Sequence, residues 1–405
     1  MSASATSPSN PSDAVFVSPF QRLNDLLAPH APGRAPINLT VGEPRHPVPA
    51  FVGPTLAREI DGFGRYPAIR GTDAFRRAVA DWLDARFGLD GDVDATDGVL
   101  PLNGSREGLF YAAIEARRIW KGTAARPAIL LPNPFYQAYA AGAVAAGCEA
   151  VMIDAGPETG FLPDLDALPD ELLARTVALY YASPANPQGA VATRADWLKA
   201  IGLARRHGFM LFADECYSEI YRGDDAPEGV LAAARATPEK YAGIVAFNSL
   251  SKRSNLPGLR CGFAAGDPAF LKGWVAFRNM AAPQVPSPVQ TVAVAALSDE
   301  AHVVENRRLY DAKFAAASRL LGTRFGYATP PGGFFLWLDV AEIGGGETAA
   351  LKLWREAGVR SIPGAYLCGP GEAGTNPGRR WLRIAMVESL ALTEEALGRI
   401  VETLV

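Results

Sequence analysis

The segment SLSKRSNLPGLRCGF, residues 249–263, lies between two runs that predict buried strands, GIVAFNS (243–249) and LRCGFAAG (259–266). Both runs are short, apolar on both faces and bounded by Gly, Pro or Asn. Pro257-Gly258 predicts a turn between them. The pattern indicates a strand, a polar turn and a second strand, with a lysine and several hydroxyl groups gathered at the turn.

Three runs upstream have the same character: PAILLPN (127–133), ALYYASP (178–184) and GFMLFADE (208–215). Helical stretches lie between several of the runs, such as RADWLKAIGLARRHG (194–208), whose apolar residues recur at intervals of three and four. Strands that are buried on both faces and separated by helices favour a largely parallel sheet covered by helices. We therefore predict an α/β fold.

The chain changes character beyond about residue 285. A helix-rich stretch there precedes two strand-like runs, GGFFLWLDV and WLRIAMV, which indicates a smaller α+β unit. Near the N-terminus, PINLTVGEP predicts a short strand that ends in a Gly/Pro turn. We expect a disordered Ser/Pro/Ala-rich tail at 1–14, a segment at 15–50 that packs on the small domain, a large domain at 51–285 and a small C-terminal domain at 286–405.

The composition excludes several classes of protein. Hydrophobic residues make up 49% of the chain and charged residues 20%, as in globular proteins. The formal net charge of −4, with both signs interspersed, argues against a nucleic-acid or anionic-membrane partner. The sequence has no apolar run of about 18 residues and its N-terminus has no secretory pattern, so we expect no membrane span and a cytoplasmic protein.

The cysteines and histidines are scattered along the chain. No CxxC pair occurs, and this spacing predicts reduced thiols and no metal site. We assign no histidine to catalysis. The residues concerned are Cys148, Cys216, Cys261, Cys368, His30, His46, His207 and His302.

A phosphate site is the most informative prediction from the central segment. In an extended chain the hydroxyls of Ser249 and Ser251 face the same side, and the turn allows Arg260 to return towards them. An arginine offers a phosphate two parallel, charge-assisted hydrogen bonds. Lys252, beside such a site, can bond covalently to a carbonyl group. The alternative is an exposed serine-rich turn with solvated charges, which SxSK alone would favour.

Polar side chains follow two of the predicted strands. Asp214 closes the strand in LFADECYSEIY, where parallel sheets hold ligand-binding groups, and an aspartate there can pair with a protonated pyridine nitrogen. Tyr217, three residues on, and Asn186, in the turn ASPANPQGA, lie within reach of a phenolic oxygen on the same ring. The alternatives are a helix cap for Asp214 and an ordinary Asn-Pro turn for Asn186.

Two further segments carry candidate ligand groups. Gly104-Ser105-Arg106 opens a helical pattern in LNGSREGLF, so backbone N–H groups at the helix start can receive a phosphate. Tyr136 in PNPFYQAY follows a strand, where its ring can stack on a flat cofactor. A simple N-cap and a core aromatic residue are the respective alternatives.

In this order, the segments resemble those of the class I/II, fold-type I aminotransferases, which depend on pyridoxal 5′-phosphate (PLP), over about residues 35 to 400. The resemblance implies a large domain with a mostly parallel central sheet and a smaller α+β domain. It implies that Lys252 holds PLP as a Schiff base and then moves a proton between the substrate Cα and the cofactor C4′. It further implies pairing of Asp214 with the pyridine nitrogen, of Asn186 and Tyr217 with the phenolic oxygen, and stacking of Tyr136 on the ring. The implied phosphate-site residues are Gly104, Ser105, Arg106 (through its backbone), Ser249, Ser251 and Arg260.

The same resemblance suggests how a substrate is held. Arg383 in WLRIAMV matches the clamp for the substrate α-carboxylate, although the local sequence alone favours a solvent-facing strand arginine. Gly42 in VGEP matches a glycine that lets the substrate approach the backbone, and Asn186 is expected beside it. Tyr66 in RYPAIRG resembles a tyrosine that reaches the phosphate in a neighbouring subunit, which implies a homodimer.

Within the family, SLSKRSNLPGLRCGF, GEPRHPVP and NPFYQAY look most like succinyldiaminopimelate aminotransferases of lysine biosynthesis. These convert N-succinyl-2-amino-6-oxopimelate and glutamate to N-succinyl-LL-2,6-diaminopimelate and 2-oxoglutarate. Arg45 and His46, beside the expected substrate entrance, are candidates for contact with a distal carboxylate. The alternatives are an aspartate, aromatic or LL-diaminopimelate aminotransferase, a PLP-dependent C–S β-lyase, and a non-catalytic PLP-binding module.

Overall fold

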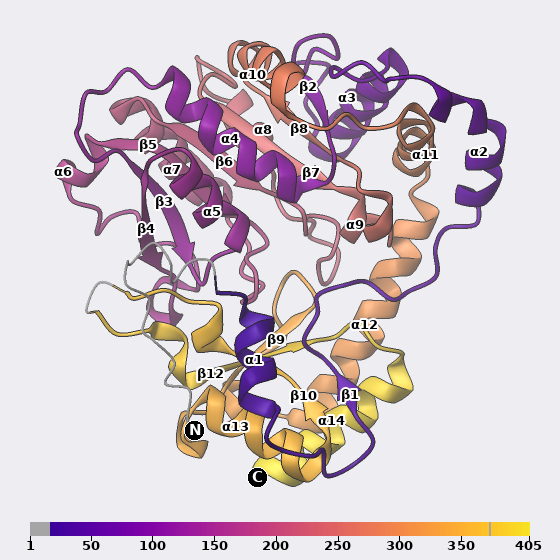
Figure 1. Cartoon of the computed structure of the whole chain (residues 1–405), viewed down its shortest axis with the longest axis vertical. Coiled ribbons are helices and arrows are strands. Elements are labelled where there is room, and N and C mark those ends of the chain that lie inside the picture. Colours follow the sequence, from indigo (N-terminus) through magenta and orange to yellow (C-terminus); the bar gives the residue numbers. More distant parts are fainter. Residues whose placement is uncertain (1–16, 372–373) are drawn as a thin grey trace.

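A computed structural model describes residues 17–371 and 374–405 of the chain. The predicted disordered tail, 1–14, lies outside the described residues. The molecule has a larger lobe built on a seven-stranded sheet and a smaller lobe that holds the C-terminal residues (Figure 1). In the described part, no helix is both long and apolar enough to cross a membrane.

The large sheet has the strand order β2-β8-β7-β6-β5-β3-β4. Strands β3 to β7 run parallel to one another, and β8 is antiparallel to both of its neighbours, β2 and β7. The prediction of a largely parallel sheet is therefore confirmed. The strands are β2 (Val99–Leu102), β3 (Ala128–Asn133), β4 (Glu149–Asp154), β5 (Thr176–Ala182), β6 (Met210–Asp214), β7 (Ile244–Ser249) and β8 (Gly262–Gly266).

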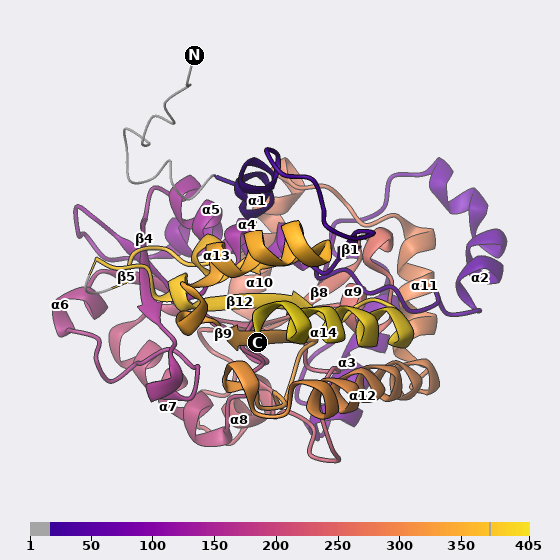
Figure 2. The same cartoon turned by 90° about the horizontal axis from the view of Figure 1, so that it is seen from below.

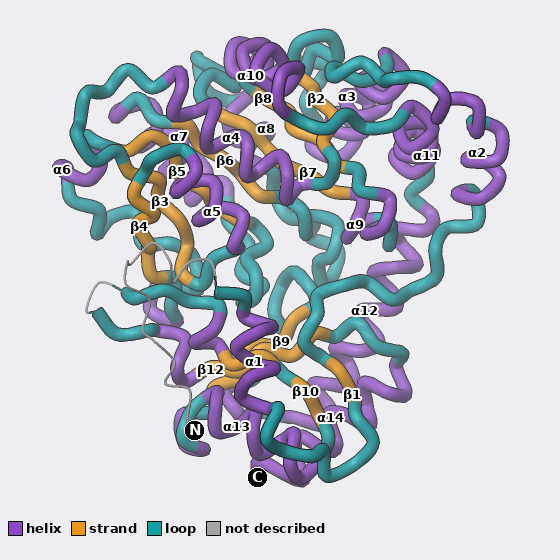
Figure 3. The backbone as a smooth tube through the Cα atoms, in the orientation of Figure 1, coloured by secondary structure: helices purple, strands orange, loops and turns teal. Residues whose placement is uncertain are grey.

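Helices cover both faces of this sheet (Figure 3), because alternate strand residues point to opposite sides. In β6, Leu211 and Ala213 pack into one core and Met210 and Phe212 into the other. The first core includes α3 (Asp73–Phe87), α7 (Arg194–His207), α8 (Val230–Arg235) and α11 (Ser287–Leu297). The second includes α4 (Ser105–Ile119), α5 (Gln137–Ala145) and α10 (Pro268–Ala281). Two short helices, α2 (Val52–Arg58) and α6 (Asp170–Leu173), lie at the periphery (Figure 1).

The small lobe is built on a three-stranded antiparallel sheet in the order β11-β12-β9. Three helices gather around it (Figure 2), and their apolar residues share one core with those of the sheet. The strands are β9 (Phe335–Asp339), β11 (Ile362–Pro363) and β12 (Trp381–Ala385), and the helices are α12 (Ala301–Leu321), α13 (Gly346–Lys352) and α14 (Leu390–Leu404).

The N-terminal segment packs on this lobe. Helix α1 (Pro19–Leu27) places Leu23 and Leu27 in a core cluster with Ile362, and β1 (Ile37–Asn38) pairs in parallel with β10 (Val359–Arg360). The division of the chain at residue 285 stays a prediction. Helix α11, just beyond it, buries its apolar face against α3 of the large lobe, while α12 runs from the large lobe into the small one (Figure 1).

Candidate active site

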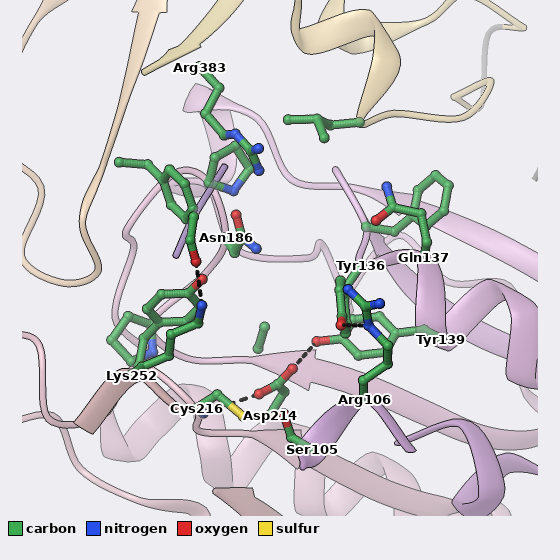
Figure 4. Close-up of a pocket in the computed structure, with 18 of the residues that line it drawn as sticks. Ser105, Arg106, Tyr136, Gln137, Tyr139, Asn186, Asp214, Cys216, Lys252 and Arg383 are labelled. Carbon is green, nitrogen blue, oxygen red and sulfur yellow. Dashed lines mark hydrogen bonds between the residues drawn. The ribbon is translucent and has the colours of Figure 1, made fainter. Parts of the chain in front are cut away.

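A cavity of about 220 Å³ lies between the two lobes (Figure 4). Its floor is formed at the carboxyl ends of parallel strands, where β5 ends at Ala182 and β6 ends at Asp214. This edge is where open α/β sheets bind ligands. Nine of the predicted site residues line the cavity: Gly42, Ser105, Arg106, Tyr136, Asn186, Asp214, Tyr217, Lys252 and Arg383.

Lys252 enters the cavity from α9 (Leu250–Arg253), a single helical turn that follows β7 directly. Its amine donates a hydrogen bond to the carbonyl oxygen of Gly42. The amine lies 5.4 Å from the ring centre of Phe334 and 5.8 Å from that of Tyr217. The two aromatic rings contribute to the burial of the amine.

The same burial lowers the pKa of Lys252 to about 8. Nearby Cys216 and Glu43 oppose this shift, whereas the charges of Arg383 and Arg106 add to it. A lysine with a pKa near neutrality supplies a neutral, nucleophilic amine far more readily than an exposed one. The group therefore has the property that a covalent bond to a carbonyl requires.

Asp214 is held by two donors. The backbone N–H of Cys216 donates to one carboxylate oxygen at 3.1 Å, and the hydroxyl of Tyr139 donates to the other. Burial, followed by the charge of Asp214, raises the pKa of Tyr139 well above its usual value, so the hydroxyl keeps its proton. Tyr139 was not among the predicted site residues. Its position three residues after Tyr136, at the start of α5, was the signal that could have identified it.

Tyr136 and Arg106 interact at the side of the cavity opposite Lys252 (Figure 4). Arg106 Nε donates to the hydroxyl of Tyr136 at 2.6 Å. This bond holds the ring of Tyr136, and Arg106 adds a positive charge at the start of α4. The first backbone N–H groups of a helix have no partner within it, so this corner presents both donors and positive charge.

Arg260 reaches the same corner although its side chain does not line the cavity. It donates to the carbonyl oxygens of Pro257 at 2.8 Å and Asn103 at 3.4 Å. Gly104 has a φ of +81°, and a Cβ atom there would lie 2.2 Å from Nη2 of Arg260. Only a glycine lets the arginine lie so close to the start of α4.

The expected geometry of the two serines is wrong. Ser249 ends β7 and caps α9, and its hydroxyl accepts a hydrogen bond from the backbone N–H of Ser251 at 3.2 Å. The chain is therefore helical just where an extended conformation was expected, because a serine at an N-cap favours the helical turn. Both serines are buried and neither lines the cavity. Their part in binding a phosphate stays a prediction.

Asn186 lies between Lys252 and Arg383 (Figure 4), and Tyr217 lines the same cavity. The side-chain oxygen of Asn186 is buried and has no hydrogen-bond partner among the described residues. Such an atom costs free energy unless a ligand or water satisfies the amide. Burial raises the pKa of Tyr217 well above its usual value, so its hydroxyl remains available as a donor.

Arg383 enters the cavity from β12 of the small lobe and is 6% exposed. The alternative of a solvent-facing strand arginine is therefore wrong. Its Nη2 donates to the carbonyl oxygen of Thr40 at 2.7 Å, its guanidinium lies 4.6 Å from the ring centre of Phe335, and its buried Nε has no partner in the described chain. Burial lowers its pKa to about 10, while Tyr217 opposes the shift. At neutral pH the side chain is a buried cation with donors to spare.

Tyr66 does not reach this cavity. Its side chain is 97% exposed, so a role in the site of another subunit stays a prediction. Among the described residues, no group of three or more His, Cys, Asp or Glu side chains has the arrangement of a metal site.

The cavity suits a flat molecule with a phosphate and an aldehyde. Three basic side chains, Arg106, Lys252 and Arg383, line the same cavity as the carboxylate of Asp214. The buried amide of Asn186, whose oxygen has no partner among the described residues, marks a place where a polar ligand group would fit. The donor set therefore matches PLP.

Comparisons with known proteins agree with this chemistry. The profile of the family described as aminotransferase class I and II matches residues 34–402. The LL-diaminopimelate aminotransferase of Syntrophobacter fumaroxidans is 31% identical over 386 residues, which cover 94% of each chain. An aminotransferase of Neisseria meningitidis superposes with a TM-score of 0.90 at 36% identity, over 96% of this chain and 98% of that chain.

A more distant solved structure, a probable N-succinyldiaminopimelate aminotransferase from Thermus thermophilus, superposes with a TM-score of 0.80. It is 27% identical, and the alignment covers 96% of this chain and 100% of that chain. The chain therefore belongs to the class I and II aminotransferases and is a transaminase of fold type I whose cofactor is pyridoxal 5′-phosphate.

Proposed function

We propose that this transaminase transfers the amino group of glutamate to N-succinyl-2-amino-6-oxopimelate in lysine biosynthesis. One observation carries the proposal: Lys252 and Arg383, which come from different lobes, line one cavity together with Asp214. An amino acid whose carboxylate pairs with Arg383 would present its Cα–H bond towards Lys252.

Each of these residues has a distinct task. Arg383 binds the α-carboxylate through its free donors, and Lys252 removes and returns the proton at Cα. Asp214, which Tyr139 and Cys216 orient, would balance positive charge at the ring nitrogen of the cofactor. When bound, the cofactor carries the amino group between the two substrates and its ring stabilises the negative charge that develops at Cα.

The remaining predicted residues would hold the cofactor. Tyr136 would stack on its ring, and Asn186 and Tyr217 would donate to its phenolic oxygen, with Asn186 and Gly42 also bordering the substrate. The start of α4, where backbone donors and positive charge meet, would receive the phosphate. The residues expected to bind the phosphate are Gly104, Ser105, Arg106, Ser249, Ser251 and Arg260.

Other residues that line the cavity are Pro19 and Phe20 of α1, Phe135, Leu367 and Gln137, which contributes a side-chain amide. These groups would contact the methylene chain and the amide of the succinylated substrate. Arg45 and His46 do not line the cavity. Arg45 pairs with Glu388, and His46 with Asn306 and Lys313, so neither supports the expected contact with a distal carboxylate.

The assay for this proposal compares amino donors in the reverse direction, with 2-oxoglutarate as acceptor. We expect the kcat/KM of N-succinyl-LL-2,6-diaminopimelate to exceed that of unsuccinylated LL-diaminopimelate, aspartate and phenylalanine by at least about tenfold. Lys252→Ala should abolish turnover and the visible absorbance of the lysine-bound cofactor. A fully active Lys252→Ala protein would refute the scheme.

LL-Diaminopimelate itself is the second candidate, because that substrate appears in the name of the relative from Syntrophobacter fumaroxidans. A preference for the unsuccinylated donor would select this alternative. Release of pyruvate from cystathionine without an oxo-acid would instead indicate a C–S β-lyase.

We further propose that the enzyme is a homodimer in which Tyr66 completes the neighbouring site. Support comes from exposed apolar side chains within one short stretch, Ile60, Phe63 and Tyr66, each more than half exposed. Mixing inactive Tyr66→Ala and Lys252→Ala chains under subunit exchange should restore activity, up to about a quarter of the wild-type level, because half of each mixed dimer regains an intact site. Mixed dimers without activity would contradict this arrangement.

A further inference from the structure

The N-terminal segment from Thr40 to His46 contacts the site at several points. The carbonyl oxygen of Thr40 accepts from Arg383, and that of Gly42 accepts from the amine of Lys252. Arg45 then pairs with Glu388, which follows β12. Two of the side chains with proposed roles in the reaction thus rest on carbonyl oxygens of one short segment, so the position of this segment matters for both.

His46 connects the segment to the interlobe helix α12. Its ring lies against Tyr310, with centroids 4.5 Å apart, and both of its nitrogens have partners. Nδ1 is hydrogen-bonded to the side-chain oxygen of Asn306, and Nε2 lies 2.7 Å from the amine of Lys313. Lys313 is 2% exposed and also donates to the carbonyl oxygen of Met386 at 3.2 Å.

The hydrogen bonds run in one direction. Lys313 only donates, so Nε2 of His46 must accept, and the ring must carry its single proton on Nδ1. That proton goes to the oxygen of Asn306. The Asn306 amide nitrogen then donates to the backbone carbonyl oxygen of Lys252 at 3.3 Å. The chain of bonds therefore ends on the residue whose amine, at its other end, is bonded to Gly42.

We propose that Asn306, His46 and Lys313 form a positioning relay, a chain of hydrogen bonds that fixes the backbone of Lys252 relative to the carbonyl group of Gly42. The chain of hydrogen bonds breaks when His46 takes up a second proton. The proposal rests on the role of Lys252 proposed above. None of the three residues lines the cavity, so they act through Lys252 and are not catalytic residues.

The reason for the break is electrostatic. A proton on Nε2 would point at the N–H groups of Lys313, and two buried cations would face each other. Burial lowers the pKa of His46; the bond to Asn306 and the charge of Glu305 oppose this shift, while Lys313 adds to it. Tyr310 also faces the ring, and the nearby Arg45 is paired with Glu388. The relay is therefore intact at neutral pH and is lost as the pH falls.

The first test is a histidine NMR titration of the wild-type holoenzyme, with the signal of His46 assigned by its loss in His46→Asn. The expected result is a neutral ring with its proton on Nδ1 at about pH 7.5, and proton uptake only below about pH 6.5. A ring that is protonated at neutral pH would overturn the proposal without the need for any variant to fold.

The second test follows kcat and the visible absorbance of the lysine-bound cofactor against pH. In the wild type, both should change at low pH with the midpoint found by NMR. In Asn306→Ala we expect kcat to fall about tenfold, with KM for glutamate nearly unchanged. The midpoint of the absorbance change with pH should then no longer coincide with the midpoint of the His46 titration. Val304→Ala, an exposed change on the same helix, is the matched control.

The outcomes separate this proposal from the proposed function. A wild-type pH profile and kcat in Asn306→Ala would sink the relay but leave the transaminase scheme standing. If Asn306→Ala does not fold, Asn306→Asp keeps the acceptor for His46 and loses the donor to Lys252, and it should show the same separation. Loss of the scheme itself would require an active Lys252→Ala enzyme.

Discussion

The hydroxyl of Tyr139 donates a hydrogen bond to the carboxylate of Asp214, and the ring of Tyr139 stacks on Tyr180 with centroids 4.5 Å apart. Tyr180 is itself fixed, because its hydroxyl is bonded to the backbone carbonyl of Leu109 in α4. Two packed aromatic rings, of which Tyr139 also lines the cavity, therefore fix the orientation of the carboxylate together with the backbone N–H of Cys216.

Tyr139→Phe should lower kcat/KM and cofactor affinity, because it removes a donor to a charged carboxylate while keeping the packing. A hydrogen bond of this kind contributes about 2 kcal/mol, so the loss should be about 30-fold. An absorbance titration of the apoenzyme with PLP measures the affinity. Tyr111→Phe, which removes a hydroxyl bonded to the exposed carbonyl of Ala281, should have little effect. Equal behaviour of the two variants would contradict the role of Tyr139.

Much of the large lobe follows from local patterns. The five predicted strands are present because short apolar runs bounded by Gly, Pro and Asn leave little choice when both faces are buried. Helix α7 forms where its periodicity predicts, and Thr193 with Asp196 closes a capping box at its start. Strands β2 and β4 were not predicted. Strand β2 has only four residues and contains a proline, and β4 is a half-buried edge strand of mixed polarity, so neither has the pattern of a buried strand.

What the sequence could not supply is contact between distant segments. The partner of α11 is α3, some 200 residues earlier, and no local pattern in the sequence predicts this contact. Asn306 and Lys313 are two helical turns apart and thus share a face of α12, but no local pattern connects them to His46. Lys252 was predictable from its own motif, whereas Arg383 was predictable only from the family resemblance, because its local sequence favours a solvent-facing arginine.

The attachment of PLP to the apoenzyme should accelerate with pH. Only the neutral amine of Lys252 reacts, and with a pKa of about 8 its neutral fraction rises from about a tenth at pH 7 to about a half at pH 8. Stopped-flow absorbance between about pH 6.5 and 9.5 would show a rate that levels off above pH 8.5. Glu43→Gln should move the midpoint down, because the charge of Glu43 raises this pKa. A rate that still rises tenfold per pH unit at pH 9.5 would count against the buried amine.

Arg383→Lys should raise KM for every amino-acid donor by about tenfold to a hundredfold, since a single ammonium cannot reproduce the planar fork. The absorbance of the lysine-bound cofactor should stay as in the wild type. Steady-state kinetics with glutamate measure the effect. The control is Arg380→Lys. Arg380 is an exposed arginine that directly precedes β12 and pairs with Asp339. An unchanged KM in Arg383→Lys would remove the carboxylate clamp from the scheme.

Gly104→Ala should lower the affinity of the folded protein for PLP. The new Cβ would displace Arg260 from the start of α4. Gly104 has a φ of +81° and a ψ of 155°, a backbone conformation that is essentially restricted to glycine, so alanine there also adds about 1–3 kcal/mol of strain. Gly88→Ala is the control for a positive φ, because Gly88 is in the left-handed region, with a φ of +64° and a ψ of 48°, and has open space around its Cβ position. Gly104→Ala should lose more stability in denaturant than Gly88→Ala, and only Gly104→Ala should raise the dissociation constant of PLP when both variants are folded. Similar constants in the two would mean that Arg260 takes no part in binding.

Lys313→Met should remove a pH dependence of stability. Burial lowers the pKa of Lys313 to about 8, below the value of about 10.5 expected for an unfolded chain. Between these values the unfolded chain binds a proton that the folded protein does not, so wild-type stability rises with pH, by up to about 3 kcal/mol, and the cost is fully present below about pH 8. The variant lacks this cost but leaves His46 and the Met386 carbonyl without a donor, so its stability at neutral pH is not diagnostic.

The diagnostic quantity is the free energy of unfolding of the wild type minus that of the Lys313→Met variant, which should grow between about pH 8 and 10.5. Lys272→Met, at an exposed lysine of α10, reports the loss of one surface charge. A wild-type-minus-Lys313→Met difference that stays flat across this range would mean that Lys313 is not buried beside His46 as a strained cation.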